Sequence, residues 1–152
     1  MEIVNLKEAP EYFEKIAEFH QKEWAHLYDG ETLEGRKNRM QSYLNDNFVP
    51  SLFVAKNDND IIGTAAIKEF DLTTDEGFTP WMSSIFVFPE HRKQGHSKEL
   101  VRHIMEQTKL NGISKIYLYT EDAEALYAGL GWKTLSRKQC QGHNIIIMKA
   151  EL

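Results

Sequence analysis

Cysteine, long hydrophobic runs and positive charge are what this sequence has least of. Cys140 is the only cysteine, so no internal disulfide bond can form, and we expect a reducing, cytoplasmic location. The longest unbroken apolar runs have four residues, for example Ile145–Met148, whereas a membrane-spanning helix needs about 20. The N-terminal residues lack the basic start and apolar stretch of a secretory signal. We therefore expect neither a membrane partner nor export.

The charge balance argues against one class of partner and is uneven along the chain. The chain has 23 Asp and Glu residues against 18 Lys and Arg residues, a net charge of -5. Dedicated nucleic-acid binders are usually basic, so we expect no nucleic-acid partner. Residues 91–103 carry a net +3 and residues 57–76 a net -5. These two segments suit an anion and a cation respectively, although two solvated faces would give the same pattern.

The spacing of apolar residues predicts alternating helices and strands. The chain has 152 residues, of which 41% are hydrophobic, and we expect one α/β domain spanning residues 1–152. Helical spacing predicts helices at Glu8–Leu27, more weakly at Leu33–Leu44, around Leu100–Thr108, and from about Asp122 to Leu130. Short apolar runs between turn residues predict seven strands, at Ile3–Val4, Leu52–Ala55, Ile61–Ile67, Trp81–Phe88, Ile116–Tyr119, Trp132–Ser136 and Asn144–Lys149.

The segment Ser84–Val101 carries the clearest chemical signal. An apolar strand runs into Pro89, then into a basic stretch around Gly95, and then into an amphipathic helix. The start of a helix leaves N–H groups without intrahelical partners, and its dipole favours negative charge. A glycine lets phosphate oxygens approach the backbone closely. The segment therefore predicts a pyrophosphate cradle, although an ordinary strand, turn and helix with solvated basic residues fits the bare charge pattern.

Two motifs in this order resemble the GNAT superfamily of N-acetyltransferases. R-x-x-G-x-S, at Arg92, Gly95 and Ser97, is similar to the family's acyl-CoA-binding motif. Ser97 departs from the usual Gly or Ala but is still small. Residues 120–132 resemble the family's N-x-x-A-x-x-x-Y-x-x-x-G-F segment, with Thr120 in place of Asn and Trp132 in place of Phe. The region from Ser84 to Trp132, which contains both segments and the residues between them, covers about a third of the chain.

The resemblance implies a fold and a site for acetyl-CoA as co-substrate. The expected fold is a mixed, mostly antiparallel sheet of six to seven strands, flanked by helices and splayed at its centre. The backbone of the central strand would contact the pantetheine arm, at Ile85, Phe86 and Val87. The next residues would hold the pyrophosphate, namely Arg92, Lys93, Gln94, Gly95, His96 and Ser97. Dimers are common in the family, so a homodimer is also compatible with the sequence.

The resemblance also implies part of the catalytic machinery. Tyr127 matches the family's general-acid tyrosine, and the Val87 amide matches its usual oxyanion donor. A lysine-like amine has a pKa of about 10.4, so its deprotonation at pH 7 costs about 4–5 kcal/mol. Some relatives carry a Glu on the central strand, but residues 81–84 include no acid. Glu69 and Asp71 are the nearest candidate bases, and they could instead bind a cationic amine while water carries the proton.

The acceptor is expected to be a primary amine on a small molecule or a peptide. The acidic stretch at residues 57–76 favours a cationic acceptor, and Asp71, Trp24 and Tyr28 are candidates for its pocket. The six histidines show no zinc-binding spacing, so we expect no metal. Two alternatives stay open at this point: a non-catalytic acyl-CoA-binding protein on the same fold, and a phosphate-binding domain unrelated to acyl transfer.

Overall fold

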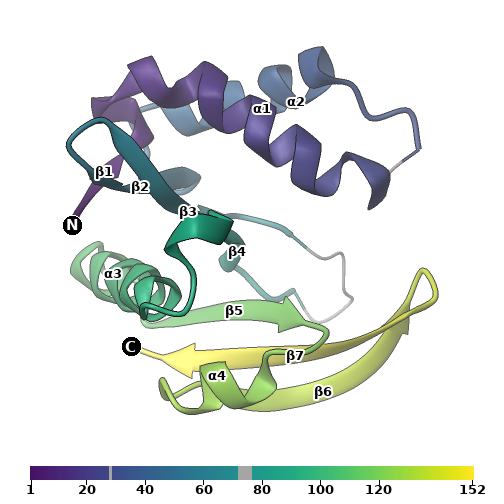
Figure 1. Ribbon diagram of the computed structural model, residues 1–152. Coiled ribbons are helices and arrows are strands. Elements are labelled where there is room, and N and C mark those ends of the chain that lie inside the picture. Colours follow the sequence, from purple (N-terminus) through teal and green to yellow (C-terminus); the bar gives the residue numbers. More distant parts are fainter. Residues whose placement is uncertain (28, 72–76) are drawn as a thin grey trace.

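The computed structural model describes residues 1–27, 29–71 and 77–152, and the strands among them form one sheet in the order β1-β2-β3-β4-β5-β7-β6 (Figure 1). Neighbouring strands are antiparallel except β4 and β5, which are parallel. The strands are β1 (Glu2–Asn5), β2 (Ser51–Asn57), β3 (Asp60–Lys68), β4 (Trp81–Val87), β5 (Lys115–Thr120), β6 (Lys133–Cys140) and β7 (His143–Glu151). The helices are α1 (Phe13–Trp24), α2 (Leu33–Met40), α3 (His96–Leu110) and α4 (Glu124–Ala128). The predicted fold class is confirmed.

Helices cover both faces of the sheet. Side chains of a strand alternate between its two faces, and in β2 Leu52 and Val54 pack with α1, whereas Phe53 and Ala55 pack with α3. Each helix contributes an apolar stripe, formed by Phe13, Ile16 and Ala17 in α1 and by Leu100, Val101 and Ile104 in α3. The two hydrophobic cores that result hold β3 and β4, the strands that shape the site, from both sides.

The first two helices are shorter than the apolar spacing predicts. α1 is preceded by a 3-10 turn at Pro10–Tyr12 and followed by another at Ala25–Leu27, so Glu8–Leu27 is not one continuous α-helix. Proline has no N–H to donate and is tolerated only in the first turn of a helix, which accounts for the late start. α2 ends at Met40 and continues as a 3-10 turn to Leu44.

The sheet opens between β4 and β5. The two strands are paired only at Trp81 and Tyr117, at the start of β4. Further along, β4 is irregular: Ser84 has a φ of 55°, and the register with β3 shifts between Thr64 and Ala66. A bulge of this kind bends a strand and increases its twist. β4 therefore stays bonded to β3 while it diverges from β5, which confirms the predicted splaying.

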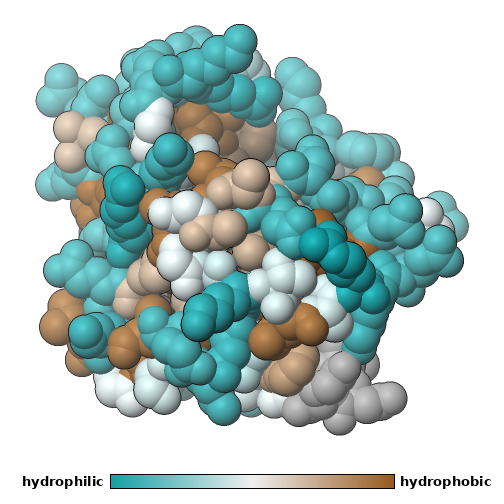
Figure 2. All heavy atoms as spheres, turned by 90° about the horizontal axis from the view of Figure 1, so that it is seen from below, coloured by the Kyte–Doolittle hydropathy of each residue, from teal (hydrophilic) through white to brown (hydrophobic). Residues whose placement is uncertain are grey.

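The edge strand β6 carries mainly polar residues. Seen from below, hydrophobic residues form small patches separated by hydrophilic ones (Figure 2). Lys133, Arg137 and Lys138 of β6 are exposed, and charged side chains on an edge strand oppose pairing with another sheet.

None of the helices in the described ranges combines the length and hydropathy of a membrane span.

Candidate active site

The connection from β4 to α3 presents backbone N–H groups to solvent. Arg92, Lys93, Gln94 and Gly95 are exposed, and no described residue accepts a hydrogen bond from the N–H groups of residues 93–98. Gly95 has a φ of 83° and Lys93 a φ of 63°, so the chain turns through left-handed conformations just before α3 begins. Free N–H groups at the start of a helix of this length can receive an anion, which is the kind of ligand that the sequence predicts for this segment.

Basic side chains surround these N–H groups. Arg92 Nε donates to the Val87 carbonyl oxygen at 2.7 Å, and its guanidinium carbon lies 5.6 Å from the centre of the Phe86 ring. Arg92 is thus anchored on β4, while Lys93 and Lys98 extend into solvent beside the same N–H groups. The combination of N–H donors and neighbouring cations fits a pyrophosphate.

The Val87 amide faces the opening in the sheet. Phe88 N–H donates to the Ile62 carbonyl at 2.9 Å, which makes Gly63 and Val87 a non-hydrogen-bonded pair of the antiparallel ladder. The Val87 N–H therefore points away from β3. Phe86 is paired with Thr64, so its backbone groups face β3. Only the backbone groups of its chain neighbours, Ile85 and Val87, remain available to a ligand in the opening.

Gly63 allows the backbones of β3 and β4 to approach closely at this point. A Cβ built on Gly63 would lie 2.4 Å from the Phe86 carbonyl oxygen and 3.2 Å from the Val87 Cα. Both contacts are with backbone, so a side chain here would displace β4. The strand pair therefore requires glycine at the level where the Val87 amide faces the opening.

A cavity of about 540 Å³ lies between the diverging strands and the first two helices. β4 and β5 line one side, with Met82, Ser83, Ser84, Ile85, Leu118 and Tyr119. Tyr127 closes this side. The facing side combines apolar and charged residues from three segments: Trp24, Leu27, Glu31, Arg36, Arg39, Lys68 and Asp71. The cavity thus brings four of the predicted site residues together, namely Trp24, Asp71, Ile85 and Tyr127.

Local hydrogen bonds fix the position of Tyr127. Thr120 Oγ1 accepts from Ala123 N–H at 3.1 Å, which holds the start of α4. Glu124 accepts from Thr134 and Arg137 of β6 at 2.5 and 2.7 Å, which ties the helix to the sheet. Tyr127 itself is 8% exposed, and burial raises the pKa of its hydroxyl. The phenol is therefore a neutral proton donor at physiological pH.

The two candidate acids differ in position. Asp71 lines the cavity that contains Tyr127, and Lys68 Nζ lies 3.7 Å from its carboxylate. Burial raises the pKa of Asp71, and the charge of Lys68 opposes this shift. Glu69 is exposed and lines a second cavity of about 460 Å³ that shares Arg36, Arg39, Lys68 and Ser84 with the first. The structure therefore favours Asp71 over Glu69.

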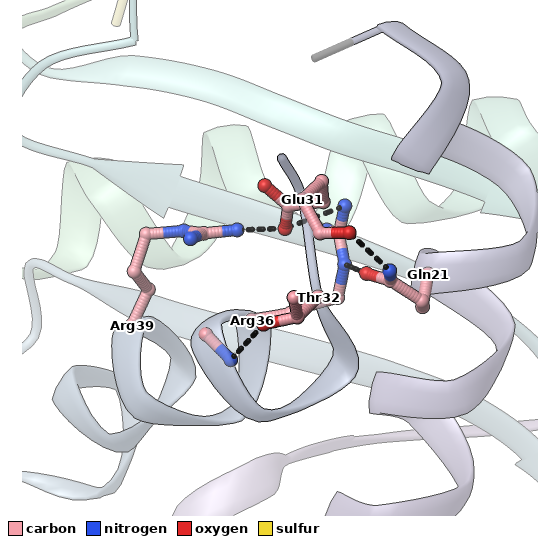
Figure 3. Close-up of polar contacts among 6 residues, drawn as sticks. Gln21, Glu31, Thr32, Arg36 and Arg39 are labelled. Atoms are coloured by element: carbon pink, nitrogen blue, oxygen red, sulfur yellow. Dashed lines mark hydrogen bonds and ion pairs between the residues drawn. The ribbon is translucent and has the colours of Figure 1, made fainter. Parts of the chain in front are cut away.

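Charged residues of α2 and the segment before it form a cluster at the cavity (Figure 3). The side chain of Glu31 is only 8% exposed, and its carboxylate contacts the guanidinium groups of both Arg36, at 3.4 Å, and Arg39. Gln21 of α1 accepts from Arg36 Nε at 2.9 Å and donates to the Glu31 carbonyl at 3.3 Å. Thr32 accepts from Gly35 N–H at 3.0 Å and so caps α2.

A buried histidine supports the bulge in β4. Thr64 Oγ1 donates to the Ser84 carbonyl at 3.2 Å, so it accepts from His20 Nε2, which lies 2.9 Å away. His20 is 3% exposed. Burial, aided by the positive charges of Arg36 and Lys68, lowers its pKa from 6.5 to about 3. The imidazole of His20 is therefore neutral in the folded protein, and its role at this position is structural.

We expect His20 to make stability depend on pH. Its pKa is lower in the folded state than in the unfolded chain, so its contribution is complete above pH 6.5 and is lost as the pH falls toward 3. At pH 5 the free energy of unfolding should be about 2 kcal/mol lower than at pH 7 for this reason. Urea unfolding of wild type and His20→Gln at both pH values measures the difference.

The control for this prediction is His26→Gln, which replaces an exposed imidazole. Wild type and His26→Gln should lose stability in parallel between pH 7 and pH 5, whereas His20→Gln should lose less. An equal loss in all three proteins would contradict the assignment. Only the change between the two pH values is compared, because the buried substitution itself alters packing.

Several residues of this site escape prediction from the sequence. Tyr28, predicted to contact the acceptor, lies outside the described residues. No sequence motif marks the residues that supply most of the charge in the cavity, namely Glu31, Arg36, Arg39 and Lys68. The three-residue spacing of the two arginines places them on one face of a helix, but nothing in the sequence shows what that face meets.

Comparisons with known proteins agree with this geometry. Residues 10–132 match the family model described as "Acetyltransferase (GNAT) family". Human N-acetyltransferase 8 is 28% identical over 116 residues, which are 74% of this chain and 51% of that protein. The chain thus spans about half the length of this curated relative.

Two solved structures show how far the fold extends. A ribosomal-protein-alanine N-acetyltransferase from Brucella melitensis is 17% identical and superposes with a TM-score of 0.76 over 100% of both chains. An aminoglycoside 6'-N-acetyltransferase complexed with coenzyme A is 14% identical, with a TM-score of 0.78 over 99% of this chain and 97% of that one. The fold, the opened sheet and the family match over most of the chain lead to one conclusion: this chain is a member of the acetyltransferase (GNAT) family.

Proposed function

We propose that this chain is an acetyl-CoA-dependent N-acetyltransferase that acetylates a primary amine by direct attack. One observation carries the proposal: the N–H groups of residues 93–98 lie at the end of the β4–β5 opening, and the cavity with Tyr127 and Asp71 lies along the same strands. A pyrophosphate at the first position and an acyl group at the second are the two ends of one acyl-CoA molecule.

Each part of the site has a defined task in this reaction. Residues 92–97 bind the pyrophosphate, and the backbone of Ile85 and Val87 contacts the pantetheine arm. The amine nitrogen attacks the thioester carbonyl carbon, and the Val87 N–H stabilises the negative charge that develops on its oxygen. The C–S bond then breaks, and Tyr127 donates a proton to the departing thiolate.

Asp71 prepares the acceptor. An amine arrives as a cation, and a carboxylate that lines the cavity attracts it and takes its proton, directly or through water. Trp24 forms an apolar wall beside this position, with its ring 5.9 Å from that of Phe86. The acceptor is therefore a small amine or a peptide N-terminus with a cationic amino group.

Ligand binding and turnover test the proposal separately. Acetyl-CoA at about 100 times its Kd should stabilise the protein by about 2.7 kcal/mol, whereas ATP and NAD at equal concentration should have little effect. Release of free thiol on addition of primary amines then reports acetyl transfer. Stabilisation without turnover on any amine would show a non-catalytic acyl-CoA-binding protein. Equal stabilisation by all three ligands would show a general phosphate-binding domain.

A further inference from the structure

Resting on the proposed function, we infer that the acceptor carries an uncharged oxygen, a carbonyl or a hydroxyl, and that the hydroxyl of Tyr43 binds it in the second cavity. Tyr43 lies in the 3-10 turn that follows α2, and it packs in the hydrophobic core that includes the apolar stripe of α1. It also lines the cavity of about 460 Å³ that adjoins the acetyl-transfer cavity. The residue therefore belongs both to the core and to the wall of a cavity.

The Tyr43 side chain is buried, but its hydroxyl is unpaired. The residue is only 6% exposed, and no described residue forms a hydrogen bond with its hydroxyl. A buried tyrosine usually finds a partner for its O–H, because an unpaired polar group inside a protein costs free energy. This hydroxyl is not one of the unpaired polar atoms that are sealed in the core. Since the residue lines the cavity, the hydroxyl is available to a molecule bound there.

The protonation state of Tyr43 favours an oxygen as its partner. Burial raises the pKa of the phenol, and the negative charge of Asp71 raises it further, more than the positive charge of Arg36 lowers it. The phenol therefore keeps its proton and acts as a donor. A ligand oxygen accepts this hydrogen bond, whereas a ligand that only donates would leave the buried O–H unpaired. The nearby charge of Asp71 disfavours a second anion, so the oxygen is uncharged.

Tyr43 lies in the direction in which an acceptor held by Asp71 can extend. Lys68 Nζ is 3.7 Å from the Asp71 carboxylate in the first cavity, and Lys68 also lines the second. The cavities meet at the residues that line both, namely Arg36, Arg39, Lys68 and Ser84. An acceptor with its amine beside Asp71 therefore reaches Tyr43 with the atoms beyond this junction.

The second cavity has the character of a binding site for the uncharged part of such a molecule. Ligand cavities typically combine apolar walls with a few polar groups that fix the orientation of the ligand. Tyr43 supplies a polar group of this kind, because its hydroxyl is unpaired among the described residues. The apolar walls come from Met40, Pro50 and Phe70.

Three series of primary amines with matched chain lengths test this inference: ω-amino amides, amino alcohols and alkylamines. The ratio of kcat/KM between an oxygen-bearing amine and its alkylamine is measured in the wild type and in Tyr43→Phe, so that intrinsic differences between the amines cancel. At the chain length that reaches the hydroxyl, we expect this ratio to be about tenfold lower in Tyr43→Phe, the effect of one hydrogen bond. A drop for the amides alone assigns a carbonyl, and a drop for the alcohols alone assigns a hydroxyl. Equal ratios in both proteins at every chain length would overturn the inference.

A matched variant and a stability measurement separate binding from packing. Tyr117→Phe removes the hydroxyl of another buried tyrosine, which lines neither cavity, and it should keep the wild-type ratios. Because the Tyr43 hydroxyl has no partner among the described residues, Tyr43→Phe should unfold at the same urea concentration as the wild type. A clear loss of stability would show that this hydroxyl is bonded within the protein, and the inference would then fall.

A binding measurement keeps this result distinct from that of the proposed function. The CoA-loaded protein is titrated calorimetrically with the same amines, which reports selectivity without turnover. If no amine is acetylated but Tyr43→Phe weakens binding of the oxygen-bearing amines alone, the proposed transfer fails and the Tyr43 site stands. If amines are acetylated with the same selectivity in Tyr43→Phe, the transfer stands and the Tyr43 site fails. If no amine binds or reacts, both fail.

Discussion

Replacing Tyr127 with Phe should lower kcat by about 10²-fold and leave the affinity for acetyl-CoA nearly unchanged. The variant removes the hydroxyl that we propose as proton donor to the leaving thiolate but keeps the ring, which packs edge-on against Trp132 at a centroid distance of 6.1 Å. General acids contribute about 10²–10⁴-fold, and the lower value is expected here for a chemical reason. The thiolate has a pKa of about 8.5 and leaves without much help. Steady-state kinetics with a saturating amine measures the effect.

A change of leaving group separates proton donation from packing. With an acyl donor whose thiol is more acidic, the leaving group needs less protonation, so the defect of Tyr127→Phe should shrink. A purely structural defect would persist with both donors. Tyr117→Phe provides the matched control, because it removes a buried phenol hydroxyl from β5 at a site where the ring stacks on Phe78. Unchanged turnover in Tyr127→Phe would remove this residue from the mechanism.

The co-substrate half of the site is predictable because it is continuous in sequence. A strand, a proline, a basic stretch with Gly95 and a helix follow one another, and each has a local signal. In the structure the same residues form one exposed turn with free N–H groups. Local chemistry and three-dimensional position coincide here, so the pattern predicts the fold of the segment and the kind of ligand it suits.

The acceptor half is not predictable in the same way, because it is assembled from separated segments. Asp58 and Asp60 contribute to the acidic balance of residues 57–76, yet they lie at the turn between β2 and β3 and line neither cavity. The charge of a continuous segment is therefore not the charge of the cavity. Arg36 and Arg39 come from a helix that the sequence predicts only weakly, and tertiary packing places them at the site.

The bulge in β4 is another feature without a clear local signal. Ser84 takes a left-handed conformation that serine seldom adopts, and the Thr64 hydroxyl bonded to its carbonyl comes from another strand. His20, from α1, completes the contact. The apolar pattern of Trp81–Phe88 predicts the strand but not the irregularity, because the residues that stabilise it are distant in the chain. Thr64 lies 20 residues before Ser84, and His20 lies a further 44 residues before Thr64.

Replacing Asp71 with Asn should lower kcat/KM for the amine by about 10²-fold at neutral pH, the lower bound for a general base. The variant keeps the shape of the side chain but can neither attract the ammonium group by charge nor take its proton. Activity should fall in the wild type as the pH drops through the pKa of Asp71, since the protonated carboxyl is not a base. Burial raises this pKa, so the fall in activity on the acid side of the pH profile (its acid limb) should lie above the value of about 3.9 for free aspartate.

The shape of the pH profile distinguishes Asp71 from its alternatives. In Asp71→Asn the acid limb should disappear, and only the titration of the amine should remain. Lys68→Met should move the limb to higher pH, because the charge of Lys68 holds the pKa of Asp71 down. Asp60→Asn, at the exposed first residue of β3, should leave the profile unchanged. If the limb survives in Asp71→Asn but is lost in Glu69→Gln, the base is Glu69; if both variants keep it, neither carboxylate is the base.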